Sequence, residues 1–327
     1  MPRTLTLEIS DWPYRVPFAT ARGAATQCRL LSVDLREGDA HGRGEAAPIR
    51  RYGHTVDTVA AEIEGVRGPI EAGATRAEIA GLLPASPARN ALDCALWDLE
   101  AKVSGRTVWQ LATLAAPRAI VTVYTLSVAE PAAMAAQALA HADLPMLKLK
   151  LGGAGDIERV RAVRAAAPRA RLLADANESW TPELYLELAP QLAALGVELL
   201  EQPFAAAADE MLAQLPHPLP ICADESCHSR ADLPRLAGCY DYINIKLDKS
   251  GGLTEALLLA ADAKARGLRL MVGCMSGTSL GMAPAHLVAQ LAEFADLDGP
   301  LLLACDREPA MVYRRGVVEP PAPALWG

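Results

Sequence analysis

The 327-residue sequence lacks the features that mark several protein classes. Its seven cysteines are odd in number, dispersed and without a CxxC spacing, so we expect buried free thiols in a reducing compartment, not a disulfide framework. No 18 apolar residues follow one another, which argues against a membrane span. The start, MPRTLTLEISDWPYRV, alternates like a strand and has no apolar core of a signal peptide. We therefore expect a cytoplasmic protein with no membrane partner.

Positive charge is also in deficit. Against 39 acidic residues stand 31 lysines and arginines, giving a net charge of −8 and a pI near 5.4. This balance argues against a nucleic-acid partner. It leaves an anionic substrate open, because a bound cation can reverse the field locally. With 51% hydrophobic and 21% charged residues, the chain has the composition of a globular protein, long enough for one β/α barrel of about 250 residues and a smaller domain.

The first third of the chain predicts an α+β domain. Residues 1–50 alternate as strands around a turn at Gly38–Asp39. Helical spacing follows from Val56 to about Val103, with Asn90 expected as an N-cap and Gly105 as a stop. A β-meander followed by helices is typical of a separate domain, and we place it at residues 1–115.

From Ala119 onward the pattern changes to alternating strands and helices. The expected strands are 120–124, 146–151, 171–176, 197–202, 219–225, 242–247 and 269–274, with an eighth near 292–298. Helical segments alternate with them, and a short extra helical stretch is expected at 209–215. We predict a barrel over residues 116–306 and a tail, 307–327, that packs back onto the first domain.

Charged residues close successive apolar runs of this second region. They are Lys150, Asp175, Glu201, Asp224 and Lys246, separated by 25, 26, 23 and 22 residues. One parallel strand, its crossover helix and two loops occupy roughly that length. Because β/α barrels build active sites at the C-terminal ends of their strands, the spacing predicts that these side chains meet. Buried charges need partners, so acids between lysines indicate a metal and proton transfer.

The lysines suit acid–base chemistry. In MLKLK, Lys148 and Lys150 share one face because strand side chains alternate with period two, and we expect that face to line the barrel interior. Mutual repulsion and a nearby cation are expected to lower their pKa values. Lys246, at the end of the sixth strand, would lie across the barrel from Lys150. Taken singly, each could be a charged strand end at the barrel rim.

Asp175, Glu201 and Asp224 predict a magnesium site. Mg²⁺ prefers hard oxygen ligands in octahedral geometry and keeps positions open for water or substrate. No His or Cys lies at an equivalent strand end among these three, which disfavours zinc. Any one acid alone could be an N-cap or a salt-bridge partner.

Together these residues resemble the enolase superfamily, in which a Lys or His base works with Mg²⁺. The resemblance covers nearly the whole chain and includes KLKLG, DANESW, EQP, CADES, NIKLDKSGGLTEAL and GCMSGTSLG. The KxK pair, the D, E and D that follow it and the lone lysine are similar to the muconate-lactonizing subgroup. This resemblance implies an α/β fold, a modified (β/α)7β TIM-type barrel with an α+β N-terminal capping domain, and one Mg²⁺ per subunit.

Within that subgroup, the chain is similar to dipeptide epimerases. Asp296-Leu297-Asp298 resembles their DxD motif, and period two places both carboxylates on one face, where they could bind a terminal ammonium. Asp298-Gly299-Pro300 could also be only a turn. The segments NALDCALWDL, RYG and LPICADESCH are similar to bacterial epimerases of L-Ala-D/L-Glu.

The same resemblance implies further substrate contacts. In those enzymes a flexible capping-domain loop supplies an arginine for the glutamate side chain, and Arg22 fits that position. Arg51 is a second candidate loop contact, and either arginine could instead be a solvated charge. Thr125 and Cys274 would line the substrate site.

The function implied is a 1,1-proton transfer at the C-terminal residue of a dipeptide, L-Ala-L-Glu to L-Ala-D-Glu. Lys150 and Lys246 would exchange acid and base roles, and Lys148 would hold the charge of the intermediate. A place in muramyl-peptide recycling follows from resemblance only, and a homo-oligomer stays open. The alternatives are N-acylamino acid racemisation, o-succinylbenzoate synthesis or cycloisomerisation. A catalytically silent, metal-stabilised binding protein is an alternative of another class.

Overall fold

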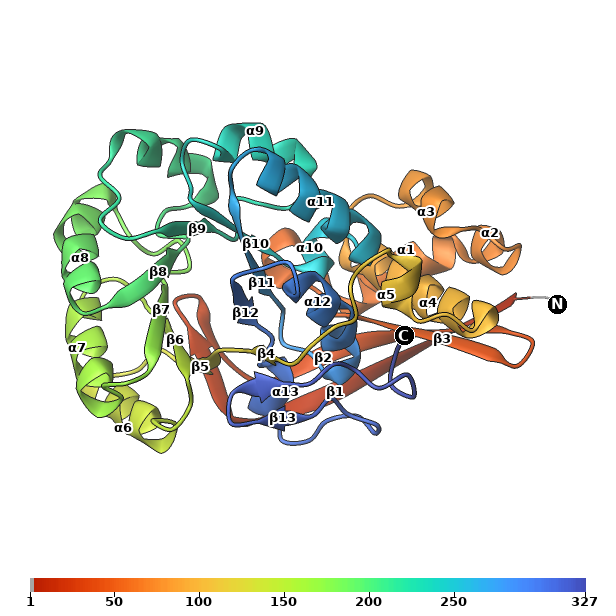
Figure 1. Ribbon diagram of the computed structural model, residues 1–327, viewed down its shortest axis with the longest axis horizontal. Coiled ribbons are helices and arrows are strands. Elements are labelled where there is room, and N and C mark those ends of the chain that lie inside the picture. The colour runs from red at the N-terminus through yellow and green to blue at the C-terminus, as the bar shows by residue number, and fades with distance from the viewer. Residues whose placement is uncertain (1–2) are drawn as a thin grey trace.

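The computed structural model describes residues 3–327, in which an antiparallel sheet domain stands beside a barrel (Figure 1). The sheet joins three strands in chain order, β1 (Arg3–Thr20), β2 (Gly23–Glu37) and β3 (Ala40–Ala46). β1 runs further than its first alternating segment predicted, with a register shift between Pro13 and Phe18. The β1–β2 hairpin therefore projects well beyond the sheet and carries Arg22 in its turn.

Helices cover one face of this sheet. After the short 3-10 helix η1 (Arg50–Tyr52) come α1 (Val56–Gly65), α2 (Arg67–Glu71), α3 (Arg76–Leu82), α4 (Pro87–Ser104) and α5 (Val108–Leu111). α4 lies directly against β3, where a Cβ on Gly44 would come within 2.0 Å of the Ala91 carbonyl oxygen. Only glycine permits so close an approach of strand and helix backbones.

The expected start of α4 was wrong. Ser86 is the N-cap, accepting the Arg89 N–H at 3.3 Å, and proline follows it at the first helical position. Ser-Pro is the stronger start signal, because proline suits the first turn, where its missing N–H costs nothing. Asn90 lies one turn further in and donates to Asp248 Oδ1 at 2.9 Å. Gly105 ends the helix with φ 68°, as expected.

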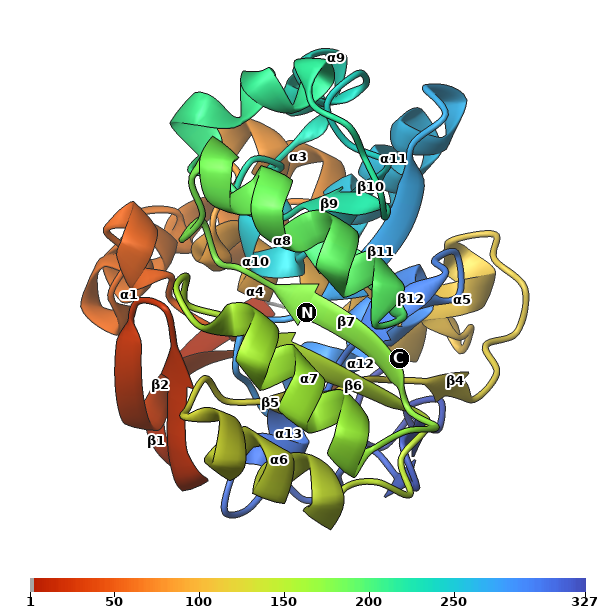
Figure 2. The same ribbon diagram turned by 90° about the vertical axis from the view of Figure 1, so that its left-hand side faces the viewer.

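The second region forms an eight-stranded parallel sheet curled into a barrel (Figures 1 and 2). In order around the barrel its strands are β5 (Tyr124–Leu126), β6 (Met146–Lys150), β7 (Arg171–Asp175), β8 (Val197–Glu201), β9 (Ile221–Ala223), β10 (Tyr242–Ile245), β11 (Arg269–Gly273) and β12 (Phe294–Asp296). The Val123 N–H donates to the Ala295 carbonyl at 3.0 Å and brings the last strand back to the first. The predicted fold class is confirmed.

Helices and short 3-10 segments alternate with these strands and surround them. They are α6 (Pro131–Ala140), α7 (Asp156–Ala166), α8 (Pro182–Ala194), η2 (Ala206–Gln214), η3 (Arg230–Asp232), α9 (Leu233–Leu236), α10 (Leu247–Ser250), α11 (Leu253–Ala265), α12 (Ser279–Ala289) and α13 (Gly299–Leu302). Within residues 3–327, no helix combines the length and the apolar character that crossing a membrane requires. The cysteines are free thiols, four of them buried.

One expected strand is divided between two sheets. Of residues 120–124, β4 (Ile120–Val121) pairs antiparallel with β14 (Val317–Val318), which pairs with β13 (Tyr313–Arg314). Only Tyr124 belongs to the first barrel strand. The chain tail returns to α4, where Trp326 Nε1 donates to the Cys94 carbonyl at 3.0 Å. The domain limits at 115/116 and 306/307 stay predictions.

The barrel strands alternate between two cores. Leu147 and Leu149 of β6 pack outward against the helices, whereas Met146 faces an inner cluster with Leu173, Leu199 and their neighbours. This inner cluster forms the apolar floor of the barrel. Because side chains alternate, the next residues on the Met146 face are Lys148 and Lys150, so charge begins where the floor ends.

Candidate active site

A layer of charged side chains lies above the apolar floor, at the C-terminal ends of the strands. Lys150, Asp175 and Glu201 are the last residues of β6, β7 and β8, and they are opposite one another in the strand register. The Lys150 Nζ lies 2.5 Å from Asp175 Oδ2. Asp175 and Glu201 are 0% and 1% exposed, so their charges are held in a medium that screens them little.

Lys148 is at the centre of this layer. Its Nζ lies 2.6 Å from Glu201 Oε2, 2.7 Å from Asp296 Oδ2 and 3.3 Å from Asp175 Oδ2. Its side chain is fully buried. Each of these contacts is to a carboxylate of the protein, and together they join β7 and β8 to β12 across the barrel.

Asp224 follows β9 directly and is contacted by two lysines. Lys246 Nζ lies 2.7 Å from its Oδ2, and Lys249 Nζ lies 2.6 Å from its Oδ1. Lys249 also donates to the backbone carbonyls of Asp224 and, at 3.2 Å, Asn244. The Asp224 carboxylate is thereby fixed from behind by Lys249, while Lys246 faces the cavity described below.

The lowering of the pKa expected for Lys148 was wrong for this arrangement of protein groups, and Lys246, for which no shift was predicted, has a raised pKa as well. Burial alone would lower the pKa of Lys246, but Asp224 and Glu201 outweigh it and raise the pKa above its usual value. Lys148 behaves alike, because Asp296, Glu201 and Asp175 outweigh its burial. The sequence pattern did not show that Lys148 would lie within ion-pair distance of three carboxylates.

The residues present fit a divalent cation. As placed, the three acids turn towards lysines, and within residues 3–327 no three acidic, His or Cys side chains already converge on one point. Glu201 Oε2 is nevertheless a buried oxygen without a hydrogen bond, since Lys148 is within ion-pair distance but not in hydrogen-bonding geometry. Burial, followed by the charge of Asp175, raises the pKa of Glu201 to about 7. A cation held by these oxygens would relieve both costs.

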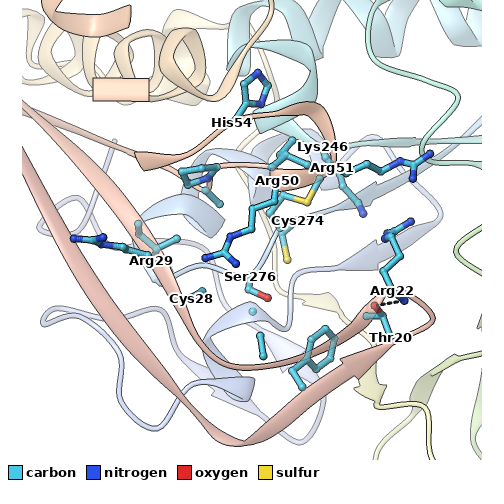
Figure 3. A pocket seen from close by; sticks show the side chains of 18 of the residues that line it. Thr20, Arg22, Cys28, Arg29, Arg50, Arg51, His54, Lys246, Cys274 and Ser276 are labelled. Carbon is cyan, nitrogen blue, oxygen red and sulfur yellow. Dashed lines mark hydrogen bonds between the residues drawn. The ribbon is translucent and has the colours of Figure 1, made fainter. Parts of the chain in front are cut away.

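A cavity of about 690 Å³ opens above the charged layer, between the barrel and the capping domain (Figure 3). Its lining contains most of the predicted site residues: Arg22, Thr125, Lys150, Asp224, Lys246, Cys274, Asp296 and Asp298. Lys148, Asp175 and Glu201 lie outside that lining. The structure thus brings the predicted side chains to one place, although the role of each stays a prediction.

Asp296 and Asp298 differ in their surroundings. Asp296 ends β12 and is bound by Lys148, whereas Asp298 is the N-cap of α13 and accepts the Thr125 N–H at 2.6 Å. Burial and then Asp296 raise the pKa of Asp298 to about 7. Within the described residues no cationic side chain lies within ion-pair distance of Asp298. A ligand ammonium would supply the missing positive charge.

The two candidate arginines both reach the barrel rim. Arg22 Nη1, from the hairpin turn, lies 2.7 Å from Glu225 Oε1 and 3.4 Å from Glu178 Oε2. Arg51 Nη2, from η1, lies 2.5 Å from Glu178 Oε2. Two capping-domain segments are thus held to the loops after β7 and β9 by ion pairs over the cavity.

Glu178, Glu225 and Lys249 were not predicted as part of the site. Each lies within a few residues of a predicted position, in DANESW, CADES and NIKLDKSGG. An acid directly after Asp224 was the available signal for Glu225. Their partners come from distant parts of the chain, which spacing along one sequence does not reveal.

Comparisons with known proteins identify the family of this chain. Residues 3–112 match the family model "Mandelate racemase / muconate lactonizing enzyme, N-terminal domain", and residues 130–323 match "Enolase C-terminal domain-like". The chain is 45% identical to the L-Ala-D/L-Glu epimerase of Escherichia coli, over 96% of this chain and 98% of that protein. It is 42% identical to an N-acetyl-D-glutamate racemase from a Pseudoalteromonas species, over 91% and 95%.

Solved structures give the same family. An enolase family member from Agrobacterium tumefaciens with homology to dipeptide epimerases, solved with sodium and L-Ala-L-Glu, is 48% identical, with TM-score 0.98 and full coverage of both chains. A dipeptide epimerase from Cytophaga hutchinsonii, complexed with Mg and D-Ala-L-Val, is 28% identical, with TM-score 0.91 over 98% of this chain and 94% of that one. The chain therefore belongs to the mandelate racemase and muconate lactonizing enzyme family of the enolase superfamily.

Proposed function

We propose that the protein is a Mg²⁺-dependent dipeptide epimerase that interconverts L-Ala-L-Glu and L-Ala-D-Glu. The observation that carries the proposal is a single cavity lined by both a lysine pair for proton transfer and an aspartate pair for an ammonium. The test is to incubate the protein with L-Ala-L-Glu in deuterated water and to follow the second residue by NMR. Deuterium at its α-carbon together with the new epimer supports the proposal, and neither product contradicts it.

Lys150 and Lys246 can serve opposite faces of one carbon. Their strands, β6 and β10, are four positions apart around the barrel, and both side chains line the cavity. An α-carbon bound between them has an amine on either side. One neutral lysine removes the proton, and the other, protonated, returns a proton to the opposite face. In the reverse direction the roles exchange.

The carboxylate layer supports this transfer. Asp175, Glu201 and Asp224 would hold the Mg²⁺, which when bound would neutralise the charge that grows on the substrate carboxylate as the proton leaves. Lys148, contacting Glu201 and Asp296, keeps these two carboxylates in place from within the barrel. The buried surroundings exclude bulk water and so strengthen each of these charge interactions.

The rival proposal is racemisation of an N-acylated amino acid. One similar relative is named an N-acetyl-D-glutamate racemase, so the rival has a specific basis. Such a substrate has no ammonium and would leave Asp298 without a counter-charge. The aspartate pair in the cavity therefore favours the dipeptide.

The first prediction concerns Asp298. Asp298→Asn is expected to lower kcat/KM for L-Ala-L-Glu by about tenfold or more, because one charge-assisted hydrogen bond contributes about 1.5–3 kcal/mol and a decade corresponds to about 1.4 kcal/mol. Steady-state kinetics measure it. Asp143→Asn, at an exposed aspartate between α6 and β6, is the matched control and should change nothing. N-acetyl-L-Glu turned over faster than L-Ala-L-Glu would instead favour the racemase.

The second prediction concerns Arg22. Arg22→Met is expected to lower kcat/KM severalfold for dipeptides ending in Glu while sparing those ending in Leu, since only the former need a guanidinium for the side chain. Comparing L-Ala-L-Glu with L-Ala-L-Leu in the variant separates this effect from loss of the Glu225 contact, which would affect both. Arg118→Met is the control at an exposed arginine. Equal losses for both substrates would exclude the role.

The remaining parts of the proposal rest on resemblance. We infer one Mg²⁺ per subunit, a place in murein peptide recycling and a cytoplasmic location. A homo-oligomer is compatible with them. Elemental analysis of the purified protein and its mass in solution test the metal count and the assembly.

A further inference from the structure

The arginines that line the cavity differ in whether a carboxylate of the protein lies beside them. Arg22 and Arg51 each lie within ion-pair distance of a carboxylate of the protein, Glu225 or Glu178. Arg50 precedes Arg51 on the same short helix and also lines the cavity, yet among residues 3–327 no carboxylate lies within ion-pair distance of it. Figure 3 shows the two neighbours leaving η1 in different directions, Arg51 towards the side of Arg22 and Arg50 into the cavity.

A second arginine stands on the same side as Arg50. Arg29 of β2 lines the cavity, and its register partner on β1 is Asp11. Their ion pair is loose, with Nε 3.4 Å from Oδ1 and side chains 53% and 50% exposed. Exposed pairs of this kind contribute little to stability, so Arg29 can turn to a ligand at small cost. Figure 3 shows Arg29 and Arg50 across the cavity from Arg22.

This arginine side and the aspartate pair line the same cavity. We call the part of the cavity lined by Tyr14, Cys28, Arg29, Arg50 and Ser276 the first-residue lobe. Tyr14 forms a β-bridge with Leu303, and the Ala304 N–H donates to the Pro13 carbonyl at 2.8 Å, so β1 lies along the chain that follows α13.

The position of α13 relates this lobe to the aspartate pair, because Tyr14 of the lobe bridges Leu303, directly after α13. α13 begins at Asp298, its N-cap. If the substrate ammonium lies at Asp296 and Asp298, the side chain on the same carbon extends from there. The first-residue lobe is the neighbouring space, and it carries two arginines with no tight carboxylate partner.

We propose that the first-residue lobe binds a carboxylate on the side chain of the N-terminal residue, so that dipeptides beginning with Glu are substrates. This inference rests on the proposed function and specifies its substrate class. Near Asp296 and Asp298 an acidic side chain would be repelled, and Arg50 and Arg29 provide the balancing charge. Arginine binds carboxylates through two parallel hydrogen bonds, which suits this recognition.

The test compares substrates of equal shape and different charge. With the metal-loaded protein, kcat/KM is measured for L-Glu-L-Glu and L-Gln-L-Glu, with L-Ala-L-Glu as the reference. We expect kcat/KM to be at least threefold higher for L-Glu-L-Glu than for L-Gln-L-Glu. Arg50→Gln should bring the ratio of the two close to one, and Arg50→Glu should invert it. A merely structural role for Arg50 would lower both rates and leave their ratio unchanged.

Arg266→Gln is the matched control. Arg266 is exposed just after α11 and outside the cavity lining, so this variant should keep both rates and the ratio of the wild type. Turnover of L-Ala-L-Glu without any preference for L-Glu-L-Glu would overturn the inference alone. No turnover of L-Ala-L-Glu would overturn the proposed function. Faster turnover of N-succinyl-L-Glu than of L-Glu-L-Glu would assign the arginines to an acyl carboxylate and overturn the inference.

Discussion

Replacing either Lys150 or Lys246 with alanine is expected to lower epimerisation of L-Ala-L-Glu by at least about a hundredfold, the lower bound for a positioned acid–base group. Each variant keeps one lysine and therefore one competent face. Lys246→Ala should still exchange the α-proton of the epimer that Lys150 serves, and Lys150→Ala that of the other epimer. Proton NMR in deuterated water, started separately from L-Ala-L-Glu and L-Ala-D-Glu, measures both exchange rates.

Opposite preferences in the two variants are the outcome that only a two-base site produces. If one variant retains full epimerisation, the lysine that it replaces has no part in proton transfer. Lys264→Ala is the control, because Lys264 is exposed near the end of α11. Each alanine also leaves a buried carboxylate partner, Asp175 or Asp224, without one of its ion pairs, so thermal unfolding of both variants should be recorded alongside the rates.

The spacing of reactive residues predicted the barrel well because the relevant information is local. Alternation in MLKLK fixes which side chains of β6 face inward, and one strand-plus-helix unit separates Lys150 from Asp175 and Asp175 from Glu201. The family and fold expectations are confirmed. Strand ends in a parallel barrel meet whatever the loops do, so this level of prediction does not require knowledge of long-range contacts.

What the sequence did not reveal depends on contacts between distant segments. The pKa of Lys246 is raised because Asp224 and Glu201, from other strands, contact or surround it. Residues 120–124 divide between two sheets because Val317 and Val318 return from the end of the chain. These pairings have no periodicity within either segment and so leave no local pattern.

In the cavity, too, some residues follow from a local sequence pattern and others only from contacts between distant segments. The DxD motif located Asp296 and Asp298 from two residues in sequence. The arginines Arg29 and Arg50, which line the same cavity, come from β2 and η1, at positions where an isolated arginine usually means only a solvated charge. Whether Arg50 has a carboxylate partner is a property of the fold, and the sequence around Arg50 gives no sign of it.

Removing the metal is expected to abolish turnover. After treatment with EDTA and its removal, L-Ala-L-Glu should be stable, and Mg²⁺ should restore the rate. The physical reason lies in the charged layer. Asp175, Glu201 and Asp224 are buried carboxylates at adjacent strand ends, and a cation held by them would neutralise the charge that grows on the substrate.

Glu201→Gln allows metal binding to be tested separately from turnover. It keeps the size and the acceptor for the Asn244 amide, 2.8 Å from Glu201 Oε1, but removes one negative charge. Calorimetry of Mg²⁺ binding to the metal-free protein should show affinity reduced at least about tenfold, because hard cations bind ionised oxygens more strongly than amide oxygens. Glu198→Gln is the control on the same strand, since Glu198 pairs with Arg171 at the opposite end of the barrel. Unchanged Mg²⁺ affinity in Glu201→Gln, or full activity after rigorous metal removal, would exclude this carboxylate layer as the magnesium site.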